Sequence, residues 1–254
     1  MKELNQIQHL YGLIGYPLSH SFSKGYFAQK FKVEGIEGRF YEAFPIDSIE
    51  KLPNLIQQYP NLRGLNVTIP YKEQIVPYMN GLGKGAAAIG AVNTVLIKEE
   101  GWFGYNSDIY GFSQSLASAI DRYGLTLEHA LILGTGGAAK AVKYALEQSG
   151  ITPIYVSRRA GEGVITYQEL DRKKIDKYKL IVNTTPLGMS PNVDSFPNIP
   201  YHYIGENHLC FDLVYNPEVT LFLRKAQQQG AFILNGLEML HLQAEKSWEI
   251  WTTN

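Results

Sequence analysis

The stretch that decides the fold of this chain is Ala130-Leu131-Ile132-Leu133-Gly134-Thr135-Gly136-Gly137-Ala138-Ala139. Its four leading apolar residues predict a short buried strand, and the residues from Lys140 to Leu146 begin a helical pattern. A strand, a glycine turn and a helix in this order, spaced G-x-G-x-x-A, are typical of a dinucleotide-binding unit. In such a unit Gly134 allows the tight turn, Gly136 lets the backbone approach a pyrophosphate, and Ala139 keeps the helix close to the sheet. The N–H groups at the helix start then hold the phosphate anion.

Alternating strand and helix patterns continue on both sides of this stretch. Strands are predicted at 154–156, 180–183, 209–212 and 232–234, and helical patterns separate several of them, which favours a largely parallel sheet. About 130 residues precede the glycine loop, enough for a separate domain. We therefore expect an α/β fold of two domains, a C-terminal Rossmann-type cofactor domain and an N-terminal α/β substrate domain, with a deep cleft between them.

The predicted domain boundaries rest on two helices. An apolar stripe between Ile109 and Tyr123 indicates a helix that crosses into the cofactor domain. The last helix carries a second stripe, formed by Leu237, Leu240, Ala244, Trp248 and Trp251. Because such a stripe needs a core to pack against, we expect this helix to return to the first domain. The predicted domains are thus 1–108, completed by 236–254, and 109–235.

The composition limits the function classes. The chain has 254 residues, of which 45% are hydrophobic and 19% charged, as in globular proteins. Its net charge of -1 gives no electrostatic case for a nucleic-acid partner or a membrane surface. We find no signal peptide or membrane span, and the lone Cys210 fits a reducing compartment, so we expect a cytoplasmic protein. The six histidines lack ligand spacing, so we expect no metal site.

The basic turn after the strand at 154–156 bears on the choice of cofactor. NAD sites carry an acidic residue at this position, where it binds the ribose 2′-hydroxyl. Here the sequence is Ser157-Arg158-Arg159, and a guanidinium suits a 2′-phosphate because it can donate two charge-assisted hydrogen bonds. A solvated basic turn is the alternative. The position favours NADP over NAD.

A second polar segment follows the predicted strand at 65–69. Thr68 and Lys72 lie close together there, where we expect a helix to open after Pro70. A lysine whose pKa is lowered by burial can transfer a proton, although an exposed first-turn lysine is the simpler interpretation. A further helix is predicted from Asn216-Pro217 to Gln229.

Three other polar segments have ordinary structural explanations. The serines of 19–23 can cap a helix. Asn93-Thr94 and Asn106-Ser107-Asp108 flank a predicted hairpin around 98–101, where these residue types favour local turns.

Taken together and in order, these segments resemble the shikimate dehydrogenase family. The similarity spans nearly the whole chain, and its most specific part is Asn66-Val67-Thr68-Ile69-Pro70-Tyr71-Lys72-Glu73. Other matching segments are 19–23, 91–94, 106–108, 134–138, 183–189, 212–217 and 236–243. The resemblance implies an NADP-dependent oxidoreductase that catalyses reversible hydride transfer between NADPH and 3-dehydroshikimate, giving shikimate in aromatic amino-acid (chorismate) biosynthesis.

The resemblance also implies roles for individual residues. Lys72 would be the general acid–base, with Asp108 beside it. Substrate binding would fall to Ser21, Ser23, Thr68, Asn93, Asp108, Tyr215 and Gln243, and of these Ser21, Ser23 and Tyr215 would hold the carboxylate. Cofactor binding would fall to Gly134, Thr135, Gly136, Gly137, Ala138, Ser157, Arg158, Arg159, Leu213, Gly236 and Met239. The expected partner is the small-molecule substrate, and the protein would be a monomer or a homodimer.

Some positions depart from the family pattern. Ile109 replaces a usual glycine, and Ser157-Arg158-Arg159 replaces Asn-Arg-Thr. Two alternatives therefore stay open: a quinate/shikimate dehydrogenase that uses NAD, and a non-catalytic shikimate-binding paralogue on the same fold. The retention of both Lys72 and Asp108 speaks against the second.

Overall fold

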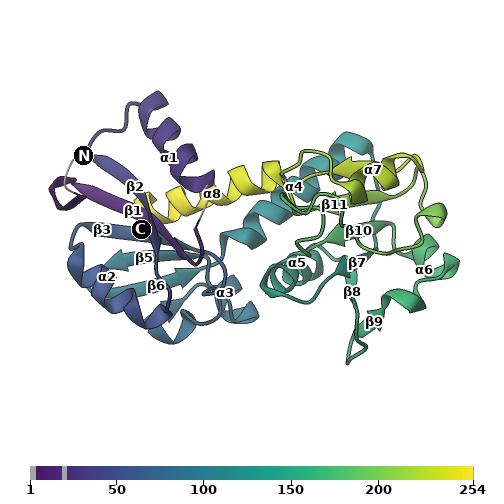
Figure 1. Ribbon diagram of the computed structural model, residues 1–254, viewed down its shortest axis with the longest axis horizontal. Helices are drawn as coiled ribbons and strands as arrows, with labels where there is room; N and C mark the ends of the chain where they lie inside the picture. Colours follow the sequence, from purple (N-terminus) through teal and green to yellow (C-terminus); the bar gives the residue numbers. More distant parts are fainter. Residues whose placement is uncertain (1–3, 19–21, 254) are drawn as a thin grey trace. The chain divides into compact units, whose positions relative to one another are not determined.

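The chain is organised as two compact units, each with its own sheet. The computed structural model describes residues 4–18 and 22–253 (Figure 1). Unit 1 comprises Met1–Ser107 and Ala244–Asn254, and unit 2 comprises Asp108–Gln243. The division between them falls inside the last helix, whereas the sequence suggested a boundary at residue 236.

The sheet of unit 1 has six strands in the order β2-β1-β3-β5-β6-β4. Its strands are β1 (His9–Gly15), β2 (Arg39–Pro45), β3 (Leu62–Val67), β4 (Gly81–Leu82), β5 (Thr94–Lys98) and β6 (Gly101–Tyr105). β1 pairs in parallel with β2 and β3, while β3 pairs with β5 and β5 with β6 in antiparallel fashion. The predicted hairpin around 98–101 is thus confirmed.

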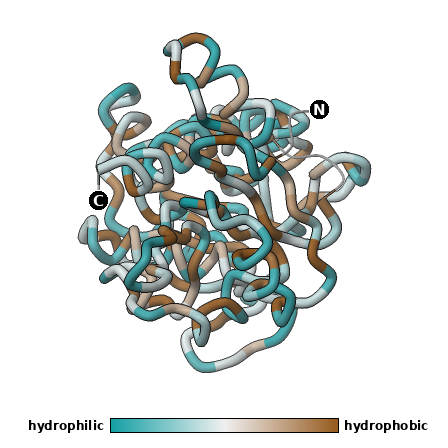
Figure 2. The backbone as a smooth tube through the Cα atoms, turned by 90° about the vertical axis from the view of Figure 1, so that its left-hand side faces the viewer, coloured by the Kyte–Doolittle hydropathy of each residue, from teal (hydrophilic) through white to brown (hydrophobic). Residues whose placement is uncertain are grey.

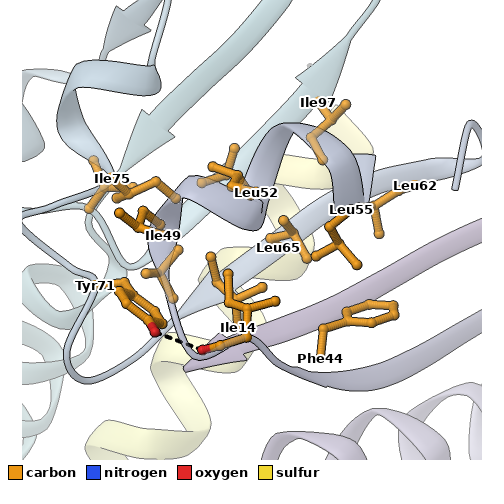
Figure 3. Packing of buried hydrophobic residues seen from close by; sticks show 14 of the residues in the cluster. Ile14, Phe44, Ile49, Leu52, Leu55, Leu62, Leu65, Tyr71, Ile75 and Ile97 are labelled. Carbon is orange, nitrogen blue, oxygen red and sulfur yellow. Dashed lines mark hydrogen bonds between the residues drawn. The ribbon is translucent and has the colours of Figure 1, made fainter. Parts of the chain in front are cut away.

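Helices cover both faces of this sheet. Unit 1 contains α1 (Phe22–Val33), α2 (Leu52–Gln58), α3 (Lys84–Ile89) and the C-terminal part of α8 (Leu237–Thr253), with short 3-10 turns η1 (Leu4–Gln6), η2 (Ile49–Lys51) and η3 (Val76–Tyr78). On one face, Leu52 and Leu55 of α2 pack on Ile14 and Leu65 (Figure 3). On the other face, residues of α1 and α8 pack around Tyr11.

The sheet of unit 2 is entirely parallel, in the order β12-β11-β10-β7-β8-β9. Its strands are β7 (His129–Leu133), β8 (Thr152–Ser157), β9 (Val164–Thr166), β10 (Leu180–Asn183), β11 (Leu209–Asp212) and β12 (Phe232–Leu234). When β7 to β12 are numbered 1 to 6 and the sheet is listed from β9 to β12, the strand order is 3-2-1-4-5-6. This is the order of the doubly wound nucleotide-binding fold, so the predicted fold class is confirmed. The crevice of that fold lies between β7 and β10.

Alternate residues of each central strand point to opposite faces of this sheet. Ala130 and Ile132 of β7 face a core that includes α4 (Ser107–Tyr123) and α5 (Gly137–Gln148). Leu131 and Leu133 face a second core that includes α6 (Arg172–Lys177) and α7 (Leu221–Gln227). The remaining elements are the 3-10 turns η4 (Tyr167–Glu169) and η5 (Tyr201–Tyr203). Both faces of the sheet are therefore covered, as a parallel sheet requires.

Two expected helices differ from the structure. The chain does not open an α-helix after Pro70 but forms turns that lead into η3. The reason is that the Lys72 carbonyl accepts a hydrogen bond from the Val92 N–H (2.7 Å) instead of joining a helical ladder. The helix predicted to start at Asn216 begins at Leu221, because the Thr220 side chain caps it by accepting from the Leu223 N–H.

Figure 2 shows hydrophobic residues in short stretches along the backbone, interleaved with hydrophilic ones. Over residues 4–18 and 22–253, no helix is long and apolar enough to cross a bilayer.

Candidate cofactor and substrate sites

A cavity of about 610 Å³ opens in unit 2 at the carboxyl ends of its central strands. Three loops form most of its lining: 134–136 after β7, Ser157 and Arg158 at the end of β8, and 184–187 after β10. The rest comes from Tyr167, Gln168 and the segment 196–198. Ligands of doubly wound sheets bind at this place, where the strand order reverses.

Glycine is present at positions 134 and 136 of the loop for different structural reasons. Gly134 has a φ of +111°, and a Cβ there would stand 2.8 Å from the Thr184 Oγ1 atom. Gly136 precedes α5 as its N-cap without a capping side chain, and a Cβ there would meet no atom within 4 Å. Gly134 is therefore required by the backbone, whereas Gly136 leaves open space at the helix start. This arrangement fits the approach of a pyrophosphate to the first-turn N–H groups.

The turn after β10 lies opposite the glycine loop and is fixed by hydrogen bonds of its own side chains and of Asn183. Thr184 Oγ1 donates to the Leu133 carbonyl (2.7 Å). Asn183 Oδ1 accepts from the Thr185 N–H (3.1 Å) and from its hydroxyl (2.6 Å). These bonds hold Thr184 and Thr185 against the glycine loop, where the two residues form one wall of the cavity.

Asp212 supports this turn from the next strand. The carboxylate is fully buried, and it accepts hydrogen bonds from Asn183 Nδ2 (2.9 Å), Thr220 Oγ1 (2.6 Å) and the Val214 N–H (3.0 Å). Burial raises the pKa of Asp212 to about 6, and the three hydrogen bonds oppose that rise. Asp212 thus joins β10 to the start of α7 at the edge of the sheet that carries the cavity.

The basic turn contributes one arginine to the cavity. Arg158 lines it together with Ser157, whereas Arg159 is not among the lining residues. Burial raises the pKa of the Tyr167 phenol, and the nearby positive charge of Arg158 opposes this rise. Sequence reasoning did not identify Tyr167 and Gln168, because no motif marks the short 3-10 turn that carries them.

Three further cofactor candidates lie close to one another in unit 2. A Cβ on Gly236 would stand 2.1 Å from the Leu213 carbonyl oxygen, so these two residues pack backbone to backbone. Met239 is buried in the same core as Leu213. None of the three lines the cavity, and neither do Gly137 and Ala138, which form the first turn of α5.

In unit 1, the turn that carries Thr68 and Lys72 is anchored in the core. Tyr71 is buried, and its hydroxyl donates to the Ile46 carbonyl (2.7 Å; Figure 3). The Thr68 N–H donates to the Ile14 carbonyl (2.9 Å) and the Tyr71 N–H to the Thr68 carbonyl (2.9 Å). The half-buried Lys72 therefore extends from a fixed backbone.

The other substrate candidates are divided between the units. Ser23 and Asn93 belong to unit 1, while Asp108, Tyr215 and Gln243 belong to unit 2. Asp108 is buried in the first turn of α4, Tyr215 is exposed, and Gln243 lies beside Gly111. Ser21 lies outside the described residues. Within the described ranges, no group of three His, Cys, Asp or Glu side chains could hold a metal ion.

Comparison with known proteins places these features in one family. Residues 13–95 match the model of the shikimate dehydrogenase substrate binding domain. The shikimate dehydrogenase (NADP(+)) of Clostridium beijerinckii is 38% identical, over 95% of this chain and 91% of that protein.

Solved structures of shikimate dehydrogenases are similar to this chain over nearly its whole length. A Thermus thermophilus shikimate 5-dehydrogenase in complex with NADP(H) and shikimate has a TM-score of 0.84 at 32% identity, covering 97% of this chain and 94% of that one. A Listeria monocytogenes shikimate 5-dehydrogenase in complex with shikimate and NAD has a TM-score of 0.86 at 28% identity, covering 97% and 92%. The chain belongs to the shikimate dehydrogenase family.

Proposed function

We propose that this chain is an NADP-dependent shikimate dehydrogenase. It catalyses reversible hydride transfer between NADPH and 3-dehydroshikimate, and the product is shikimate for aromatic amino-acid biosynthesis. One observation carries the proposal, in a chain that belongs to this family. The cavity of unit 2, where the strand order reverses, is lined by both the glycine loop and Arg158. It acts in the cytoplasm as a monomer or homodimer, without a nucleic-acid or membrane partner.

Unit 2 binds the cofactor in this proposal. The bound cofactor supplies the hydride. Gly134, Thr135 and Gly136 hold the pyrophosphate with the first-turn N–H groups, and Gly137 and Ala138 belong to the same helix start. Arg158 binds the ribose 2′-phosphate through its guanidinium, with Ser157 beside it and Arg159 as a second basic group.

Leu213, Gly236 and Met239 face the nicotinamide in this assignment. The observation behind it is that Leu213 and Gly236 pack against each other and that Met239 shares a core with Leu213. Gly236 and Met239 are buried and Leu213 is partly buried, and an apolar set of this kind would keep water away from the reacting carbon.

Lys72 carries the proton transfer. Reduction of a ketone produces an alkoxide, which needs a positive charge and then a proton. A half-buried lysine on a fixed turn is placed to supply both. Asp108 is the second catalytic residue in this assignment, as the family pattern implies.

Unit 1 supplies most of the substrate contacts. Ser21 and Ser23 bind the carboxylate, together with Tyr215. Thr68 and Asn93 bind ring hydroxyls with Asp108 and Gln243. Polar groups of this kind select the substrate, because an analogue that lacks a hydroxyl leaves a buried partner without its hydrogen bond.

The direct test is NADPH oxidation by the purified protein in the presence of 3-dehydroshikimate. We expect turnover that depends on 3-dehydroshikimate, and binding of NADP and shikimate by calorimetry. Binding of shikimate without turnover would instead identify a non-catalytic paralogue.

A further inference from the structure

The cofactor cavity of unit 2 has a second polar edge, which belongs to none of the sequence motifs. Tyr167 and Gln168 of η4 form this edge and line the cavity together with Ser157 and Arg158. Figure 1 shows β8 and β9 side by side in the sheet. Because η4 follows β9 directly, it reaches the cavity from the strand next to β8.

The pairing of these two strands places Tyr167 beside Arg158. Ser157 at the end of β8 lies opposite Thr166 at the end of β9. The two strands are parallel, and neighbouring strands lie about 5 Å apart. Arg158 and Tyr167 are the next residues after this pair, so their backbones leave the sheet side by side.

Local hydrogen bonds fix this arrangement. In the loop that joins the two strands, the Val164 N–H donates to the Gly161 carbonyl (3.1 Å), and the Gly161 N–H donates to the Val164 carbonyl (3.3 Å). At the start of η4, Glu169 Oε2 accepts from the Thr166 N–H and from the Thr166 hydroxyl, at 2.7 Å each. The turn that carries Tyr167 is therefore held next to the end of β8.

Tyr167 is anchored by its ring and open at its hydroxyl. The side chain is partly buried and packs against the core that includes Val156 and Leu170. Among residues 4–18 and 22–253, none forms a hydrogen bond with the Tyr167 hydroxyl, and this oxygen is accessible rather than buried. Burial of the ring raises the pKa of the phenol, so the hydroxyl keeps its proton and can donate a hydrogen bond to a ligand.

The charges around this edge favour an anion. Arg158 is exposed, and it forms no ion pair with any residue that the structure describes. None of the described residues that line the cavity is Asp or Glu. An NAD site uses an acidic residue here to bind the ribose 2′-hydroxyl, whereas a 2′-phosphate needs hydrogen-bond donors and no carboxylate.

We propose that the Tyr167 hydroxyl is a second ligand of the ribose 2′-phosphate, beside Arg158, and that Tyr167 thereby helps to select NADP. The inference rests on the proposed function, in which unit 2 binds NADP. An exposed arginine loses side-chain freedom when it binds, whereas a tyrosine anchored in a core is already in place. The bond to a phosphate is charge-assisted, while NAD offers only a neutral hydroxyl at this position.

Two nucleotide fragments test the proposal without turnover. Adenosine 2′,5′-bisphosphate carries the 2′-phosphate, and adenosine 5′-monophosphate lacks it. Tyr167→Phe should weaken binding of the bisphosphate about 10-fold, the lower range for a hydrogen bond to a charged group, and leave binding of the monophosphate unchanged. Calorimetric titration of the full-length protein measures both affinities. Urea unfolding of the ligand-free variant should differ little from that of the wild type.

Tyr203→Phe is the matched control. Tyr203 lies in the short turn η5 and is partly buried against the same core as Tyr167, but it does not line the cavity. Its substitution should leave both affinities unchanged. In an Arg158→Lys background, Tyr167→Phe should still weaken binding of the bisphosphate, because the hydroxyl contacts the phosphate itself.

The inference would be overturned by equal losses for the two fragments in Tyr167→Phe, or by no loss for either. Loss of the effect in the Arg158→Lys background would also overturn it, because Tyr167 would then act only through the arginine. Failure of the proposed function would show separately, as a wild-type protein that does not oxidise NADPH with 3-dehydroshikimate. The fragment titrations need no turnover and would then decide the inference alone.

Discussion

Thr184 occupies the space that a side chain on Gly134 would need. The Thr184 Oγ1 atom lies 2.8 Å from the ideal Cβ position of Gly134, and that hydroxyl is itself held by the Leu133 carbonyl at 2.7 Å. The glycine loop after β7 and the turn after β10 therefore fit together as one structure.

Substitution of the two loop glycines should separate stability from cofactor binding. Gly134→Ala places a Cβ against Thr184 at a φ of +111°, and we expect it to lower the free energy of unfolding by about 1–3 kcal/mol. Gly136→Ala meets no neighbour within 4 Å, so its effect on unfolding should be smaller while NADP affinity falls clearly. Urea unfolding and NADP titration of both variants test this, and a stable Gly134→Ala protein would contradict it.

Arg158 should determine the preference for NADP. Because Arg158 lines the cavity and Arg159 does not, Arg158→Ala should weaken NADP binding about 10- to 100-fold, the range for a lost charge-assisted hydrogen bond. NAD affinity should change little. Arg159→Ala is the matched control. If both cofactors lose affinity equally in Arg158→Ala, the arginine does not meet the 2′-phosphate.

Replacement of Lys72 should lower turnover far more than it weakens substrate binding. We expect Lys72→Ala to lower kcat by about 10²–10⁴, the usual contribution of a positioned acid–base group, with a smaller change in KM. Lys32→Ala, at an exposed position of α1, controls for the loss of a positive charge. A near-normal kcat in Lys72→Ala would remove this residue from the mechanism.

Asp212 should make stability depend on pH. Its pKa is raised from 3.8 to about 6 in the folded protein, so the folded state binds the proton more tightly than the unfolded state. The contribution of this group to the free energy of unfolding is therefore present below pH 3.8 and is lost as the pH rises to about 6. The loss amounts to about 3 kcal/mol, at about 1.4 kcal/mol for each pKa unit.

The test compares urea unfolding of the wild type and Asp212→Asn across this pH range. The stability of Asp212→Asn relative to wild type should increase from pH 4 to pH 6 and stay constant above it. Asp194→Asn, at an exposed site of the same unit, is the control. A stability difference that does not vary with pH would contradict the assignment.

The cofactor half of the fold could be predicted from sequence because its signals are local. The apolar run before Gly134, the glycines and the following helical pattern occur within a short stretch, and each has one structural meaning. The parallel order of the strands followed from their alternation with helices.

Other features depend on contacts between distant segments and could not be predicted. The chain after Pro70 forms turns because the Lys72 carbonyl bonds to Val92, twenty positions along the chain. Tyr167 and Gln168 reach the cavity only through the placement of η4. Likewise, Asn66 is the first residue of the family motif in the sequence, but only the structure shows that its amide is held between Tyr41 and Ser247.

The measurement that tests the central claim most directly is a comparison of kcat/KM for shikimate and quinate, each with NADP and with NAD. The account predicts the highest value for shikimate with NADP, because Arg158 lines the cofactor cavity. A higher value for quinate with NAD, or no turnover of shikimate with either cofactor, would contradict it.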